Sequence, residues 1–115
     1  MIEQRFKEII DKLISSTKQK KIKWEVTERE TEFKVVLGSS MVTTDNWLLE
    51  TGVMCVDLTL WNSNKEVAGR IAFENDEKEE KDYEELLVLY TLAKNSYYLV
   101  DETFAEILNK LDFEE

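Results

Sequence analysis

The sequence contains no histidine and no proline, and it has only three glycines and one cysteine in 115 residues. Without histidine, Ser-His-Asp and Cys-His catalysis, the usual zinc sites and the commonest general base are excluded. The glycines, Gly38, Gly52 and Gly69, are at least 14 residues apart. A phosphate-binding P-loop or a dinucleotide fingerprint needs clustered glycines, so the sequence contains neither motif.

Long apolar runs are also missing. The longest, Leu86 to Ala93, is interrupted by Thr91 and is too short to span a membrane. Met1 leads directly into a charged amphipathic segment, without the apolar core of a signal peptide. A single cysteine cannot form an internal disulfide, which fits a reducing compartment. We therefore expect a cytoplasmic protein that does not bind membranes.

The composition that remains is that of a folded domain. Hydrophobic residues make up 43% of the chain and aromatic residues 10%, which favours a packed core despite a charged fraction of 35%. With no proline and only scattered glycines there is no linker, so we predict a single domain over residues 1–115.

Charge is distributed unevenly along the chain, which has a net charge of -10. Residues 1–23 hold seven Lys/Arg and three Asp/Glu, a net of +4, whereas residues 74–85 hold eight acids and two lysines, a net of -6. Residues 101–115 carry six acids and one lysine, a net of -5. This acidity disfavours nucleic acid and anionic membranes as partners, because phosphate binding needs clustered Lys/Arg.

Apolar periodicity predicts the order of the secondary-structure elements. Helical spacing in residues 2–17 is followed by alternation in five segments, residues 22–26, 32–37, 39–44, 53–61 and 66–73. Residues 45–52 are expected to be a connecting loop. A helix is predicted after a capping box formed by Asp82 and Glu85, and a last helix after Asp101 carries Phe104, Ile107, Leu108 and Leu111.

This order, α-β-β-β-β-β-α-α, indicates an α+β domain. Hairpin-length connections predict a five-stranded antiparallel meander, since parallel strands would need long crossovers. We expect the N-terminal helix and the two C-terminal helices to pack on one face of this sheet.

Three stretches, KIKWEVTERETEFKVVL, LTLWNSNKE and YEELLVLYTLAKNSYYLVDETFAEILNKL, carry a resemblance. Together they resemble a recurrent type of small, uncharacterised bacterial protein. In that type a Lys-Trp-Glu strand precedes a sheet and two helices, the second of which opens after a Val-Asp step. The resemblance spans most of the chain and implies a compact bacterial α+β domain. It brings no assigned catalytic residues.

Few residues are candidates for chemistry. Cys55 is expected to be a small buried hydrophobe, because nothing near it in sequence would activate a thiolate. The acids of residues 74–85 are expected to form a solvated loop and a favourable helix amino terminus, with binding of a cation or a basic partner as the alternative. We assign no catalytic residue, no cofactor site and no metal ligand.

Two tryptophans and one aspartate are candidates for an interface. Trp47 falls in the expected loop, and Trp61 lies on the face of its strand that also carries Asp57, opposite the main apolar set. Large aromatic side chains on a polar surface are enriched at binding hot spots. The alternative is that each tryptophan covers a sheet edge or a loop base.

Three functions are compatible with the sequence. The first is a non-catalytic protein-interaction or structural module that contacts another protein or itself, with a homodimer through the uncovered sheet face as one form. The second is an acidic antagonist that neutralises a basic partner, either immunity-like or mimicking nucleic acid. The third is an enzyme using only carboxylates, tyrosine or a metal. The missing catalytic residues favour the first over the third.

Overall fold

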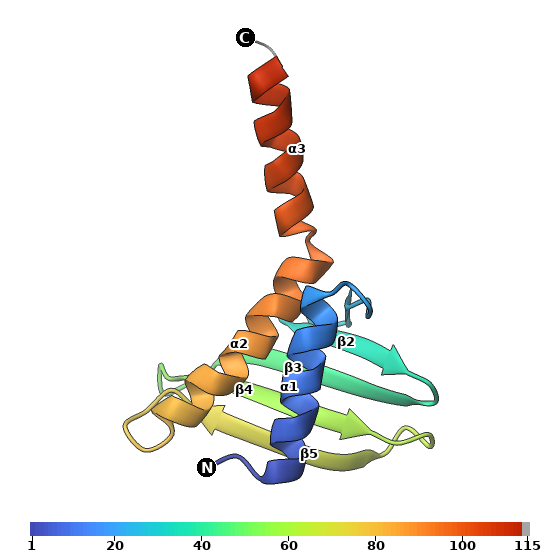
Figure 1. Cartoon of the computed structure of the whole chain (residues 1–115). Coiled ribbons are helices and arrows are strands. Elements are labelled where there is room, and N and C mark those ends of the chain that lie inside the picture. The colour runs from blue at the N-terminus through green and yellow to red at the C-terminus, as the bar shows by residue number, and fades with distance from the viewer. Residues whose placement is uncertain (114–115) are drawn as a thin grey trace.

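The computed structural model describes residues 1–113 and confirms the α+β class and the predicted order of elements (Figure 1). Five strands form one antiparallel sheet in the order β1-β2-β3-β4-β5, which is the predicted meander. The elements are α1 (Gln4–Lys18), β1 (Glu25–Val26), β2 (Glu32–Leu37), β3 (Ser40–Leu48), β4 (Met54–Trp61), β5 (Val67–Glu74), α2 (Glu80–Tyr97) and α3 (Val100–Phe113).

The hydrophobic core lies between the sheet and the two helices α1 and α2, which cross the same face of it (Figure 1). Alternate residues of the strands supply one side of this core, because successive side chains of a strand point to opposite faces. The helices supply the other side through their apolar faces. Fully buried members are Ile10 of α1, Phe33 and Val35 of β2, Val56 and Leu58 of β4, and Leu86 and Leu89 of α2.

Trp24 and Tyr90 hold two connecting segments against this core through hydrogen bonds. Trp24 is 1% exposed, and its indole N–H donates a hydrogen bond of 2.9 Å to the hydroxyl of Thr17 at the end of α1. The hydroxyl of Tyr90 in α2 donates to the backbone oxygen of Thr31 at 2.6 Å. Burial raises the pKa of Tyr90 to about 12, so the hydroxyl keeps the proton that it donates.

Three predicted boundaries are wrong. The first strand, predicted over residues 22–26, is limited to Glu25–Val26. Residues 45–48, expected to begin a loop, continue β3, because Asp45 and Asn46 find partners in the sheet that offset their poor strand propensity. The amide of Asn46 donates to the backbone oxygen of Cys55 and to the hydroxyl of Tyr83. The capping box is also wrong: α2 begins at Glu80, and Asp82 in its first turn pairs with the terminal ammonium of Met1 at 2.9 Å.

The last helix, α3, projects from the rest of the molecule (Figure 1). α2 ends at Tyr97. Two residues later, Leu99 has a φ of 52°, in the left-handed region that a leucine rarely adopts, and the chain then continues as α3. Every residue from Asp101 to Phe113 is exposed. The radius of gyration, 16.0 Å, exceeds the roughly 13 Å of a compact domain of this length. The expectation that both C-terminal helices cover the sheet therefore holds for α2, whereas α3 extends beyond the sheet.

Candidate functional site

The three residues predicted for an interface, Trp47, Asp57 and Trp61, lie on the face of the sheet that α1 and α2 leave uncovered. We call this the open face. Strand pairing places Trp47 opposite Cys55, Asp57 opposite Asp45, and Trp61 opposite Met41. Residues paired across antiparallel strands point to the same side. Trp47 is level with Cys55, six residues before Trp61 on β4, so the two tryptophans stand at opposite ends of a stripe roughly 20 Å long. The structure thus brings all three residues onto one surface.

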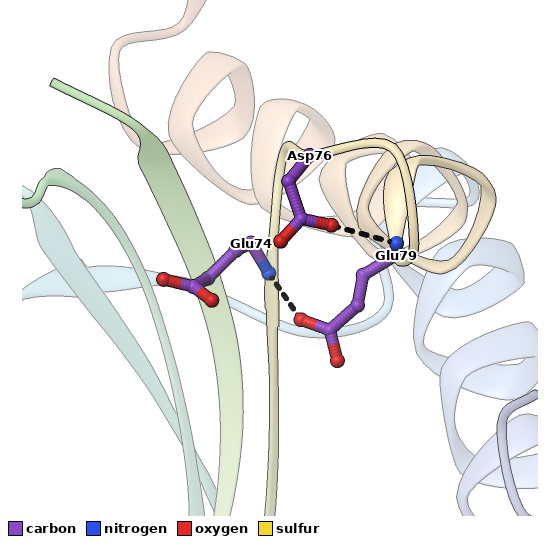
Figure 2. Close-up of side chains that lie close together, drawn as sticks. All are labelled: Glu74, Asp76 and Glu79. Atoms are coloured by element: carbon purple, nitrogen blue, oxygen red, sulfur yellow. Dashed lines mark hydrogen bonds between the residues drawn. The ribbon is translucent and has the colours of Figure 1, made fainter. Parts of the chain in front are cut away.

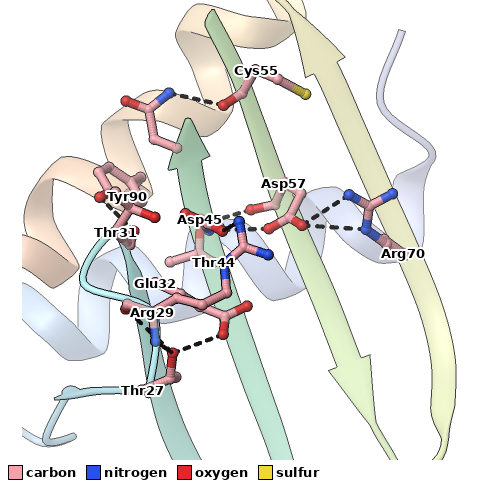
Figure 3. A network of polar contacts seen from close by, with 11 residues as sticks. Thr27, Arg29, Thr31, Glu32, Thr44, Asp45, Cys55, Asp57, Arg70 and Tyr90 are labelled. Carbon is pink, nitrogen blue, oxygen red and sulfur yellow. Dashed lines mark hydrogen bonds and ion pairs between the residues drawn. The ribbon is translucent and has the colours of Figure 1, made fainter. Parts of the chain in front are cut away.

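Two ion pairs occupy the middle of the open face (Figure 3). Arg29 of the β1–β2 connection contacts Asp45 Oδ2 through Nη2 at 2.8 Å. Arg70 of β5 donates to Asp57 Oδ2 from Nη2 at 3.0 Å and from Nε at 3.2 Å. The backbone N–H of Asp45 donates to Asp57 Oδ1 at 3.0 Å, which links the two pairs. The arginines thus cover the aspartates, of which Asp45 is 2% exposed and Asp57 7%.

The electrostatics of Asp57 reflect this burial. Burial raises the pKa of Asp57 above its ordinary value, and the nearby charge of Asp45 acts in the same direction. The guanidinium of Arg70 and the amide of Asp45 oppose this rise because they bond to the ionised form. Asp57 is therefore an internal ion-pair partner of the sheet, and its carboxylate oxygens are taken up by donors of its own chain.

The aromatic residues of the open face are also engaged within the chain. Trp61 is half-buried, and its indole N–H donates to the hydroxyl of Thr43 at 3.0 Å. The guanidinium of Arg29 lies 6.0 Å from the ring centre of the half-buried Trp47, within the range of a cation–π contact. Cys55 is buried as predicted, and burial raises the pKa of its thiol, which disfavours the reactive thiolate.

Among the described residues, Glu74, Asp76 and Glu79 are the one acidic group close enough to hold a cation, with one oxygen from each within 4.8 Å of the others. Figure 2 shows that two of these carboxylates bond to the backbone instead. Glu79 Oε1 accepts the N–H of Glu74, and Asp76 Oδ1 accepts the N–H groups of Lys78 and Glu79, each at 2.9 Å. These bonds close the turn that leads from β5 into α2.

A hollow of about 720 Å³ lies between the end of α1, the segment before β1 and the junction of α2 with α3. Its charged rim is balanced, since three lysines face three acids, and Lys20 pairs with Glu102 of α3 at 3.2 Å. The hollow therefore offers no excess of charge to an ionic ligand. The charged residues of the rim are Lys18, Lys20, Lys23, Glu25, Asp101 and Glu102.

Among the described residues, α3 carries a group of exposed large apolar side chains. Four side chains recur at positions i, i+3, i+4 and i+7 and so form one face of this helix. We call them the contact stripe: Phe104, Ile107, Leu108 and Leu111, which are 66%, 53%, 58% and 61% exposed. The sequence predicted this apolar face, but the prediction was that the face packs against the sheet. Apolar spacing looks the same whether the covering surface is the chain's own sheet or another molecule.

Comparisons of the chain with protein families, with curated proteins and with solved structures found no match. Within residues 1–113, none of the helices combines the length and the apolar character needed to cross a membrane.

Proposed function

We propose that this protein is a non-catalytic protein-interaction module of a bacterial cytoplasm, and that α3 is the helix with which it contacts its partner. The observation that carries the proposal is the exposure of the contact stripe, four large apolar side chains that touch no core. Contiguous apolar surface of this kind marks a site of protein association. A helix that contains no buried residue adds little to the stability of the fold, which leaves association as the use of its apolar face.

The spacing of apolar residues in α3 indicates that the partner presents a helix to it. Val100, Phe104, Ile107 and Leu111 are separated by four, three and four residues. This is the spacing of the a and d positions of a heptad, with which one helix packs along another. The partner surface that fits it is an apolar seam on a helix.

The polar residues of the open face support the non-catalytic part of the proposal. Asp57 is bonded to Arg70, and Asp45 Oδ2 is bonded to Arg29, while Asp45 Oδ1 is buried without a hydrogen-bond partner. Both carboxylates are buried beneath arginines, which favours a structural role over that of an acid or base acting on a substrate. The thiol of Cys55 is buried, which also fits a reducing cytoplasm.

Site-specific photo-crosslinking in the cells that produce the protein tests the proposal. A benzophenone-bearing residue replaces Leu108 in the contact stripe in one variant. In the control it replaces Asn109, which points away from the stripe because neighbouring residues are about 100° apart around a helix. We expect a discrete protein adduct from position 108 and little from position 109. Equal yields at the two positions would show that the stripe is not a contact surface.

A further inference from the structure

We infer that the partner of α3 is a second copy of this chain, and that the two α3 helices pack antiparallel to each other along their contact stripes. This inference rests on the proposed function and names its partner. The heptad spacing, the direction in which α3 projects and the placement of its charges each support it.

The heptad spacing is self-complementary in the antiparallel direction. With Phe104 level with the partner's Ile107, Val100 comes level with the partner's Leu111, and both relations repeat by symmetry. Antiparallel helices pair an a position with a d position, and this register gives such a pair at all four levels. Leu108 lies at the flank of the seam, where it widens the apolar surface.

The projection of α3 selects the antiparallel direction. The helix has 14 residues and is therefore roughly 21 Å long, and the sheet, α1 and α2 all lie at its amino end (Figure 1). Parallel packing would bring two bodies to the same end of the helix pair. Antiparallel packing places them at opposite ends, and it also aligns the helix dipoles favourably.

The charges of α3 are compatible with a copy of itself, which matters for a chain of net charge -10. In the proposed register the four acids of the helix come level with Lys110, Asn109, Ala105 and Leu99 of the partner, so no acid meets another acid. Glu102 and Glu106 lie on the side of α3 opposite the contact stripe. Glu102 is also paired with Lys20 of its own chain. The four acids are Asp101, Glu102, Glu106 and Asp112.

The area buried between the two α3 helices indicates how strongly the dimer should associate. Each of the four side chains of the contact stripe removes on the order of 100 Å² from water, so the eight side chains of the symmetric pair bury roughly 800 Å². Stable specific interfaces bury about 1,200–2,000 Å², and transient ones bury less. We therefore expect a reversible dimer with a dissociation constant in the micromolar range.

Sedimentation velocity of the full chain, from about 1 to 500 µM, tests the inference. We expect the mass to rise from 13.6 kDa toward twice that value as the concentration increases. Ile107→Glu places a charge in the seam of both copies and should weaken the dimer at least about 100-fold, which corresponds to about 2.7 kcal/mol. Asn109→Glu adds the same charge on the opposite side of the helix. Position 109 and the partner's Glu102, with which it is level, both point away from the seam, so the dissociation constant should stay within about threefold. Both positions are exposed, so circular dichroism should show an unchanged fold.

The direction of packing is tested with a spin label on Asp112→Cys, with Cys55 replaced by alanine. Antiparallel helices hold the two labels more than about 20 Å apart, whereas parallel helices bring them side by side. Adjacent labels would overturn the antiparallel arrangement. A chain that stays monomeric while position 108 crosslinks to a different protein would overturn the second copy as partner and leave the proposed function standing. A dimer that Ile107→Glu does not weaken would contradict both.

Discussion

At the scale of single residues, the least expected feature is a pair of aspartates buried in the open face of the sheet. Asp45 and Asp57 sit side by side on β3 and β4, and each is covered by one arginine. A buried ion pair contributes little net stability, because the attraction of the charges is offset by the loss of their hydration. The raised pKa of Asp57 indicates that, for this carboxylate, the loss of hydration outweighs the attraction.

Asp57→Asn should therefore destabilise the protein less at pH 7 than at pH 4. The folded-state pKa of Asp57 lies above the value of about 3.9 expected for an unfolded chain. Between these two values the folded state binds more protons, so the wild-type protein loses stability as the pH rises through that window. The asparagine variant lacks this loss. Urea unfolding of both proteins at pH 4, 5.5 and 7 measures the effect. A difference in the free energy of unfolding between the wild-type protein and the variant that increases toward pH 7 would contradict the prediction.

The sequence predicted the residues of the core better than those of the polar network. The alternating segments 22–26 and 32–37 contain Trp24, Phe33 and Val35 at apolar positions, and all three are buried. Periodicity places Asp45 in a loop and Arg29 between two strands, 16 residues earlier, and so gives no sign that the two side chains form an ion pair. Contacts between such segments depend on strand register, which periodicity alone does not fix.

At the scale of elements, α2 and α3 show how similar apolar patterns lead to different environments. Both helices carry large apolar residues at helical spacing. Leu86 and Leu89 of α2 are fully buried, whereas Ile107 and Leu108 of α3 are more than half exposed. The bend at Leu99 directs α3 away from the sheet. The sequence at this point contains no glycine or proline, the residues that usually indicate the end of a helix.

Matched truncations of one leucine in each helix should separate the two roles. Leu86→Ala should lower the free energy of unfolding by about 2–5 kcal/mol, because it leaves a cavity in the core. Leu108→Ala should lower it by less than about 0.5 kcal/mol, as expected for an exposed position. Urea unfolding below 1 µM protein, where we expect the chain to be monomeric, provides the measurement. A loss above about 1 kcal/mol for Leu108→Ala would mean that α3 supports the fold.

At the scale of the whole molecule, a folded body carries an amphipathic arm, and residues 101–115 hold half of the net charge of -10. The longest extent of the chain is 52 Å. Two copies joined by antiparallel α3 helices would share one helix length of roughly 21 Å and reach roughly 80 Å from end to end. Their folded bodies would then be well separated, beyond the roughly 8 Å over which physiological salt screens charge.

Salt should strengthen this dimer. Each copy carries a net charge of -10, so the remaining repulsion between copies weakens when ions screen it, while apolar contacts do not. Between about 50 and 500 mM NaCl the dissociation constant should fall by a few-fold, as measured by sedimentation. A complex of this chain with a basic partner would respond in the opposite direction, because screening weakens attraction between unlike charges. Loss of the dimer at high salt would therefore indicate a charge-driven contact.

The bend at Leu99 also sets the direction of α3 relative to the rest of the molecule. A single residue with a φ of 52° sets the direction of a rigid arm roughly 21 Å long. A rotation of about 10° at this residue moves the far end of α3 by roughly 4 Å, and in a dimer it swings the whole second body through the same angle. A left-handed leucine is held at a cost of roughly 1–2 kcal/mol, so replacement by glycine would remove the strain and free the joint. The angle between two molecules would thus be controlled by one backbone torsion that neither of their contact surfaces contains.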